Sequence, residues 1–159
     1  MKAVTTIGDP AYTLWNLDDL EDTAPRFGLE DRGEVRPARE ALHGRKTGLT
    51  HYRWKPGKRV GFGHFHSTDE EIYVVVRGGG RMKLNDDVVD IRTNDAFRVA
   101  PTTIREWEAG PDGLELIAFG THTEGDDGLE RDWWTTDLTV APAGARHPSS
   151  RSAASSQRR

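Results

Sequence analysis

The chain has 159 residues, a formal net charge of −4 and no long run of basic residues, which argues against a nucleic-acid surface and favours a small-molecule partner. It contains no cysteine, so disulfide bonds and thiolate ligands or nucleophiles are excluded. Because no segment approaches the roughly 20 apolar residues that span a bilayer and the first residues lack the apolar core of a signal peptide, we expect one cytoplasmic domain without a membrane partner.

Residues 1–47 are predicted to form an N-terminal extension. An edge strand is expected over 12–17, where apolar and polar residues loosely alternate. Helix formers follow Pro37 over 37–42 and predict one short helix that ends near Gly44. The main domain is therefore preceded by a short helical N-terminal segment.

Residues 48–120 consist of short segments of high β-propensity separated by turn residues. The predicted strands cover 49–54, a hairpin over 62–76, and then 81–84, 88–91, 96–100, 104–108 and 114–119. Gly78–Gly80 predict a sharp turn, and further turns are expected at 85–87 and 93–95. Many short strands with few helices indicate an all-β domain, either a sandwich or a closed barrel of the jelly-roll kind.

The hairpin carries two histidines and a pair of acidic residues. Alternate side chains on a strand point to the same face, so His64 and His66 should lie side by side, and the return strand brings back Glu70 or Glu71. Two imidazoles and one carboxylate on one face suit a divalent metal ion, typically non-haem iron but also zinc or manganese. A His-x-His pair alone also occurs on polar strand faces for solubility only, so the surrounding spacing matters.

That spacing resembles the first motif of the cupin superfamily. His64 and His66 are followed after four residues by Glu71, and after six more by Gly78. The resemblance implies that His64, His66 and Glu71 are metal ligands, since Glu71 stands in the family's place relative to the glycine, and that Glu70 points away. It also implies a jelly-roll barrel over about 49–120 that holds a divalent ion such as Fe, Mn, Zn or Ni.

The second cupin motif can be aligned with residues 94–105, but several of its residues differ. Asn94 and Thr102 stand where the family has glycines, and Pro101 lies one place later than the family proline. Most importantly, Arg105 replaces the histidine that is the fourth metal ligand in the family. The fold is expected to tolerate these changes, whereas a four-ligand metal site is not.

If Arg105 points into the barrel, Trp107 shares its face, and Tyr73 lines the same cavity as Glu71. Arginine cannot ligate a metal, but its planar fork binds a carboxylate or phosphate at two points. Arg105, Trp107 and Tyr73 are therefore the predicted substrate-binding residues for an anionic ligand. Three arrangements stay open: the metal is bound and Arg105 binds the substrate, or Arg105 pairs with Glu71 in a metal-free site with a histidine as general base, or Arg105 points outward.

The C-terminal part is predicted from composition. Residues 121–141 are expected to pack on the barrel, with Trp133 and Trp134 covering the sheet or a partner subunit. His122 could swing in as a replacement ligand, although a histidine in such a loop is usually solvated. Residues 142–159, rich in Ser, Ala and Arg, are predicted to be disordered.

Two classes of function follow from these residues. The first is an enzyme, a metal-dependent oxygenase, isomerase, lyase or cyclase acting on an anionic or polar organic molecule, with His64, His66 and Tyr73 as candidate catalytic residues. The second is a metal-free protein that binds a ligand or acts as an accessory protein without catalysis. The fold does not choose between them. We favour the enzyme, and we expect a homodimer, the commonest symmetric assembly.

Overall fold

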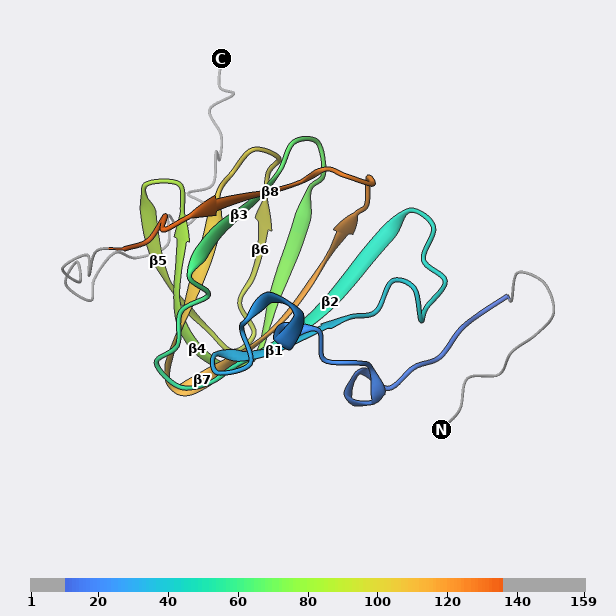
Figure 1. Ribbon diagram of the computed structural model, residues 1–159, viewed down its shortest axis with the longest axis horizontal. Coiled ribbons are helices and arrows are strands. Elements are labelled where there is room, and N and C mark those ends of the chain that lie inside the picture. Colours follow the sequence, from blue (N-terminus) through green and yellow to red (C-terminus); the bar gives the residue numbers. More distant parts are fainter. Residues whose placement is uncertain (1–10, 136–159) are drawn as a thin grey trace, which may run out of the picture.

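The computed structural model describes residues 11–135, so the tail predicted at 142–159 lies outside the described residues. Within this range, eight antiparallel strands form one sheet that curls into an open barrel (Figure 1). The all-β class and the barrel-like sheet are thereby confirmed. Of the helices in this range, none has the length and apolar character needed to cross a membrane.

Two short 3-10 turns precede the sheet: η1 (Leu17–Asp19) and η2 (Ala24–Phe27). The strands are β1 (Gly33–Pro37), β2 (Thr47–Trp54), β3 (Phe62–His66), β4 (Glu71–Leu84), β5 (Asp87–Arg92), β6 (Ala96–Val99), β7 (Arg105–Thr121) and β8 (Asp127–Arg131). The path β1-β2-β7-β3-β8 runs through neighbouring strands, while β4 pairs with β5, β6 and β7.

The N-terminal extension differs from the sequence prediction. The predicted helix over 37–42 is wrong, because this segment is the turn that joins β1 to β2, closed by hydrogen bonds such as the one from the Ala38 N–H to the Leu49 carbonyl. The edge strand predicted over 12–17 is also wrong, because β1 occupies the edge of β2, with Val35 paired to Tyr52. The only helical structure in residues 11–47 is the pair of 3-10 turns.

β4 runs through the three glycines that were predicted to form a sharp turn. β4 continues past Gly78–Gly80, and the expected sharp turn is instead a bend with register shifts against β7. Gly80 is needed there, because an added Cβ would lie 2.0 Å from the carbonyl oxygen of Glu108. The bend lets β4 pair with β6 before the glycines and with β5 from Gly79 onward.

Two positions of the second motif adopt left-handed backbone conformations. Asn94 has φ of 73° and Thr102 has φ of 65°, which is the left-handed region that glycine adopts most readily. Asparagine tolerates this region, whereas it is unfavourable for a β-branched residue such as threonine. The Thr102 N–H donates to the His66 carbonyl oxygen over 2.6 Å, so the turn holds the end of β3 in place.

The sheet also extends beyond the expected last strand. β8 pairs with β3, with His64 opposite Leu129 and His66 opposite Asp127. After β8, the Arg59 guanidinium lies 4.3 Å from the Trp134 ring centroid and the Lys83 ammonium lies 4.0 Å from that of Trp133. These cation–π contacts pack the two tryptophans against the barrel.

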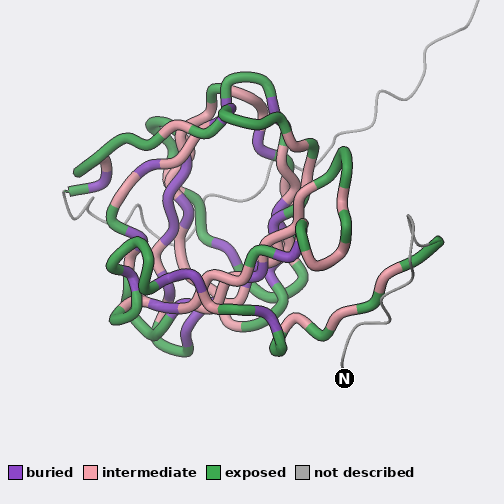
Figure 2. The backbone as a smooth tube through the Cα atoms, turned by 45° about the vertical axis from the view of Figure 1, so that its right-hand side comes forward, coloured by how far each residue is buried: buried purple, intermediate pink, exposed green. Residues whose placement is uncertain are grey.

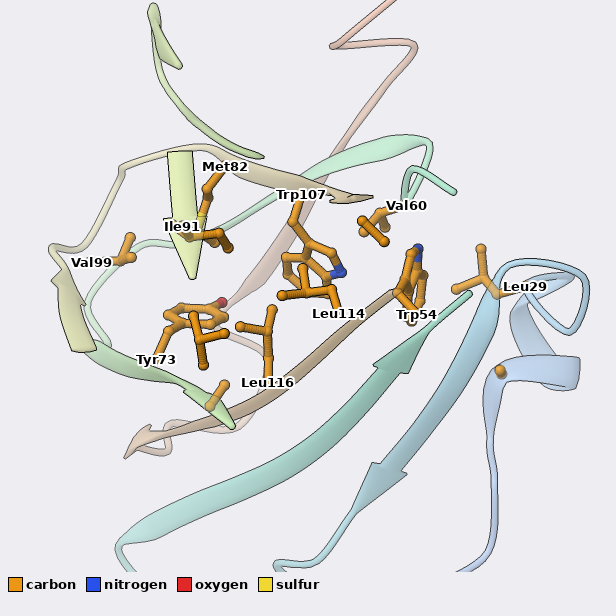
Figure 3. Close-up of a cluster of buried hydrophobic side chains, with 14 residues drawn as sticks. Leu29, Trp54, Val60, Tyr73, Met82, Ile91, Val99, Trp107, Leu114 and Leu116 are labelled. Carbon is orange, nitrogen blue, oxygen red and sulfur yellow. The ribbon is translucent and has the colours of Figure 1, made fainter. Parts of the chain in front are cut away.

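The hydrophobic core fills one end of the barrel (Figure 3). The Trp107 ring lies at its centre, with ring centroids 4.9 Å from Tyr52, 5.7 Å from Trp54 and 6.1 Å from Tyr73. Figure 2 shows the buried residues concentrated along the strands and the exposed ones at the turns. Because β7 contributes Trp107, Leu114 and Leu116 to this core, only its last residues, such as Gly120 and Thr121, are left to line the opposite end.

Candidate functional site

A cavity of about 660 Å³ occupies that opposite end of the barrel. Its walls come from the starts of β2 and β4, the ends of β3 and β7, the start of β8 and the N-terminal segment before β2. His64, His66, Glu71 and Asp127 all line it. The hairpin therefore delivers its two histidines and its glutamate to one cavity, as alternation on β3 predicts.

The two histidines converge on a carboxylate from another strand. His64 Nε2 and His66 Nδ1 each lie 3.2 Å from Asp127 Oδ1, and the two imidazole centroids are 4.7 Å apart. One ligand atom from each of the three residues lies within 4.8 Å of the other two. Two nitrogen donors and one oxygen donor at this spacing are able to share one divalent cation.

Arg105 points into the barrel and is engaged by other residues there. Only 1% of Arg105 is exposed, so the arrangement in which it points outward is not formed. Its guanidinium donates to Glu71 Oε2, to the Tyr73 hydroxyl over 3.1 Å and to the His64 carbonyl over 3.2 Å. Tyr73 in turn donates to Glu71 Oε2 over 2.6 Å. The buried Glu71–Arg105–Tyr73 network thus uses most donors of the guanidinium.

The surroundings of Glu71 and His64 shift their pKa values and so determine their protonation states at neutral pH. Burial raises the pKa of Glu71, but the hydrogen bond with His66, the Arg105 charge and the Tyr73 hydrogen bond outweigh it and lower the pKa to about 2. Burial, aided by the charges of Arg105 and His66, lowers the pKa of His64 to about 4. At neutral pH Glu71 is therefore anionic and the His64 ring is uncharged.

His66 lies between two carboxylates. Its Nε2 lies 3.4 Å from Glu71 Oε1, and its Nδ1 faces Asp127. Among the described residues, the buried Nδ1 has no hydrogen-bond partner. With the ring proton on Nε2 toward Glu71, the Nδ1 lone pair is left free on the cavity side, which is the arrangement of a metal-binding histidine oriented by a second carboxylate.

A second group of potential ligands, His66, Asp69 and Asp126, is close enough to hold an ion, but its oxygens are already used. Asp126 accepts the backbone N–H groups of Ser67, Thr68 and Asp69, and Asp69 accepts the N–H and hydroxyl of Thr123. Donors that point at a carboxylate repel a cation in the same place. These two aspartates therefore tie the loop after β3 to the loop before β8.

The other predicted site residues lie in the core, on the surface or in the cavity wall. Tyr73 and Trp107 are buried in the core, with exposed fractions of 0% and 4%, so as substrate-binding residues they stay predictions. Glu70 points away as expected and forms an exposed ion pair with Arg98. His122 lines the cavity without joining the three-residue cluster.

Sequence reasoning missed Asp127. It follows the last predicted strand in a Gly- and Asp-rich segment, a pattern that is typical of a solvated loop. Only the pairing of β8 with β3 brings it opposite His66. The acidic pair at 126–127 is visible in the sequence, but the sequence does not show that this segment pairs with β3.

The comparisons with known proteins extend these observations. Neither a protein-family model nor a curated protein matches the sequence. Among solved structures, a cupin protein from Bacteroides fragilis is similar over 84% of this chain and 99% of its own, with 18% identity and a TM-score of 0.59.

Two further similar structures are an oxalate decarboxylase and KdgF. Oxalate decarboxylase from Bacillus subtilis matches over 72% of this chain, with 18% identity and a TM-score of 0.60, and this match spans only 31% of the decarboxylase. KdgF from Halomonas sp. matches over 60% of this chain and 84% of its own, with 21% identity and a TM-score of 0.51. At these identities the similarity concerns the fold. The curled sheet and these neighbours together show that the chain is a small protein with the cupin fold.

Proposed function

We propose that the chain is a small-molecule enzyme that uses a divalent metal ion held in the cavity by His64, His66 and Asp127. The observation that carries this proposal is the buried Nδ1 of His66, which forms no hydrogen bond within residues 11–135 and lies beside the other two donors. A buried polar nitrogen without a hydrogen bond is unfavourable, and a metal ion would supply the missing partner.

The residues present fit such an ion. Two imidazoles and one carboxylate form a three-ligand set that leaves coordination positions open for substrate or water, and it suits Fe, Mn, Zn or Ni. When bound, a divalent ion of this kind supplies Lewis-acid polarisation of a substrate oxygen and lowers the pKa of water. The cavity of about 660 Å³ around the cluster is within the range of small-molecule sites, roughly 300–1,000 Å³.

In this proposal Glu71 positions His66 and does not ligate the ion. Both Tyr73 and Arg105 donate to Glu71 Oε2, and Glu71 Oε1 faces His66 Nε2. Moving Glu71 onto a metal would break its buried ion pair with Arg105, which is costly. Asp127 is exposed and held by fewer partners, so it is the carboxylate that is free to coordinate.

A metal-free binding protein is the second candidate. It is favoured by the direct contact between His64 Nε2 and Asp127 Oδ1 at 3.2 Å, which partners these two groups without an ion. In that case a neutral histidine in the cavity could accept a proton from a bound ligand. The two candidates differ in one property that is simple to measure, the affinity for metal.

Calorimetric titration of chelator-treated protein with Fe, Mn, Zn and Ni tests the proposal. We expect one ion per chain, at least about 100-fold weaker binding in His64→Ala, His66→Ala and Asp127→Asn, and about 10–100-fold weaker binding in Glu71→Gln, as for a residue that orients a ligand. His122→Ala, which changes a cavity histidine outside the cluster, and Glu130→Gln, an exposed carboxylate on β8, should bind like wild type. A wild-type protein that binds none of the four metals would overturn the proposal in favour of the metal-free candidate.

A further inference from the structure

Arg39 is a cation in the cavity wall that has no partner in the part of the chain that the structure describes. It lies in the turn between β1 and β2 and lines the same cavity as His64, His66 and Asp127. Within residues 11–135 its side chain forms no hydrogen bond or ion pair, and its Nε is shielded from solvent. A guanidinium stays charged at all physiological pH values, so among the described residues this charge has no neutralising partner.

Two nearby arginines show the opposite situation. Arg26, which also lines the cavity, is paired with Glu21 at 2.6 Å, and Arg105 is paired with Glu71. The sequence predicted Arg105 as the anion-binding residue, but its donors are occupied. Arg39 is therefore the guanidinium whose fork is available to a ligand in this cavity.

The remaining charges permit an anion at this position. Asp127 would be neutralised by a bound metal, and the Glu71 charge is neutralised by Arg105. Three further carboxylates, Asp19, Glu21 and Glu40, also line the cavity, but all three are exposed, so water and salt screen their charges. With a divalent ion in the cluster, the metal and Arg39 would be the positive centres of the cavity that Glu21 and Glu71 do not neutralise.

We propose that Arg39 binds the carboxylate of a small organic acid whose other polar end reaches the His64–His66–Asp127 cluster, so that the substrates are organic carboxylates. This inference rests on the proposed metal site. The planar guanidinium binds both oxygens of a carboxylate, which gives orientation as well as attraction.

The test uses full-length, metal-loaded protein and a series of dicarboxylates, malonate, succinate and glutarate, with the corresponding neutral diamides as controls. Calorimetry should show binding of at least one dicarboxylate and of no diamide. We expect Arg39→Gln to weaken that binding by at least 10-fold and Arg39→Lys by less, since lysine keeps the charge without the fork. Arg26→Gln, which changes a paired arginine of the same wall, should alter affinity by less than threefold.

The metal titration is repeated on Arg39→Gln so that a failure of the Arg39 inference can be distinguished from a failure of the proposed metal site. Unchanged metal affinity together with lost dicarboxylate binding supports the inference. Equal dicarboxylate binding by wild type and Arg39→Gln, or no binding of any dicarboxylate by wild type, overturns the inference and leaves the metal site standing. A wild-type protein without metal affinity instead overturns the proposed function.

Discussion

The Glu71–Arg105 ion pair is the strongest specific interaction of the site, and its removal gives a quantitative prediction. At a separation of about 4 Å and an effective dielectric constant of about 20, two unit charges attract by about 4 kcal/mol. Replacing Arg105 by methionine removes this attraction and leaves Glu71 charged, mostly buried and bonded only to Tyr73 and His66. Breaking a buried pair in this way costs about 3–5 kcal/mol, so we expect Arg105→Met to lower the free energy of unfolding by that amount.

Urea denaturation of the metal-free protein, followed by tryptophan fluorescence, measures this loss. The Trp107 ring lies 6.1 Å from the Tyr73 ring, so it reports on the network. The double variant Glu71→Gln with Arg105→Met should be more stable than Arg105→Met alone, because no unpaired charge is left. This comparison keeps the test meaningful even if the single variant is largely unfolded.

The neighbouring surface pair supplies a matched control. Arg98 and Glu70 lie 2.5 Å apart but are about half exposed, so Arg98→Met should cost less than about 1 kcal/mol. A coupling energy between Glu71 and Arg105 of about 2–3 kcal/mol is expected from a double-mutant cycle. A coupling energy below about 0.5 kcal/mol, or equal losses for Arg105→Met and Arg98→Met, would refute the reasoning.

Three further predictions concern the frame around the site. Thr102→Gly should raise the free energy of unfolding by about 0.5–1 kcal/mol, because relief of the left-handed strain at φ of 65° exceeds the added flexibility of glycine; a lower value in urea denaturation would argue against strain. Burial raises the pKa of Glu106, so stability should fall as pH rises above the ordinary carboxyl pKa, and Glu106→Gln should make the thermal melting temperature depend less on pH in that range; an unchanged pH dependence would contradict this. Gly120→Ala should cost about 1–3 kcal/mol, because the new Cβ would lie 2.0 Å from the Glu70 carbonyl oxygen, whereas Gly48→Ala, with 3.9 Å to its nearest neighbour, should change stability by less than about 0.5 kcal/mol.

Much of the fold could be predicted because its signals are local. Strands of β-branched and aromatic residues separated by Gly, Asn and Asp turns indicate an all-β domain, and the turns at Asn85 and Asn94 are formed as expected. Asn94 and Thr102, the two positions aligned with glycines of the second motif, both have positive φ angles, a conformation that glycine adopts readily.

The parts that could not be predicted depend on contacts between distant segments. β1 contains a glycine, two charged residues and a proline, which is a suitable composition for an edge strand but lacks the apolar alternation that reveals strands. Likewise, the sequence predicts that Arg105 lies opposite the histidines, but it does not show that Glu71 neutralises the Arg105 charge. That pairing and the approach of Asp127 are decided by how β7 and β8 pair with β3.

The location of a bound metal ion tests the central claim most directly. Anomalous diffraction from crystals soaked in Zn, Mn or Ni should place one ion about 2.0–2.2 Å from a nitrogen of His64, His66 Nδ1 and an Asp127 oxygen, with Glu71 still paired to Arg105. An ion bound to Glu71 with Arg105 displaced, or an ion bound outside this cavity, would contradict the account.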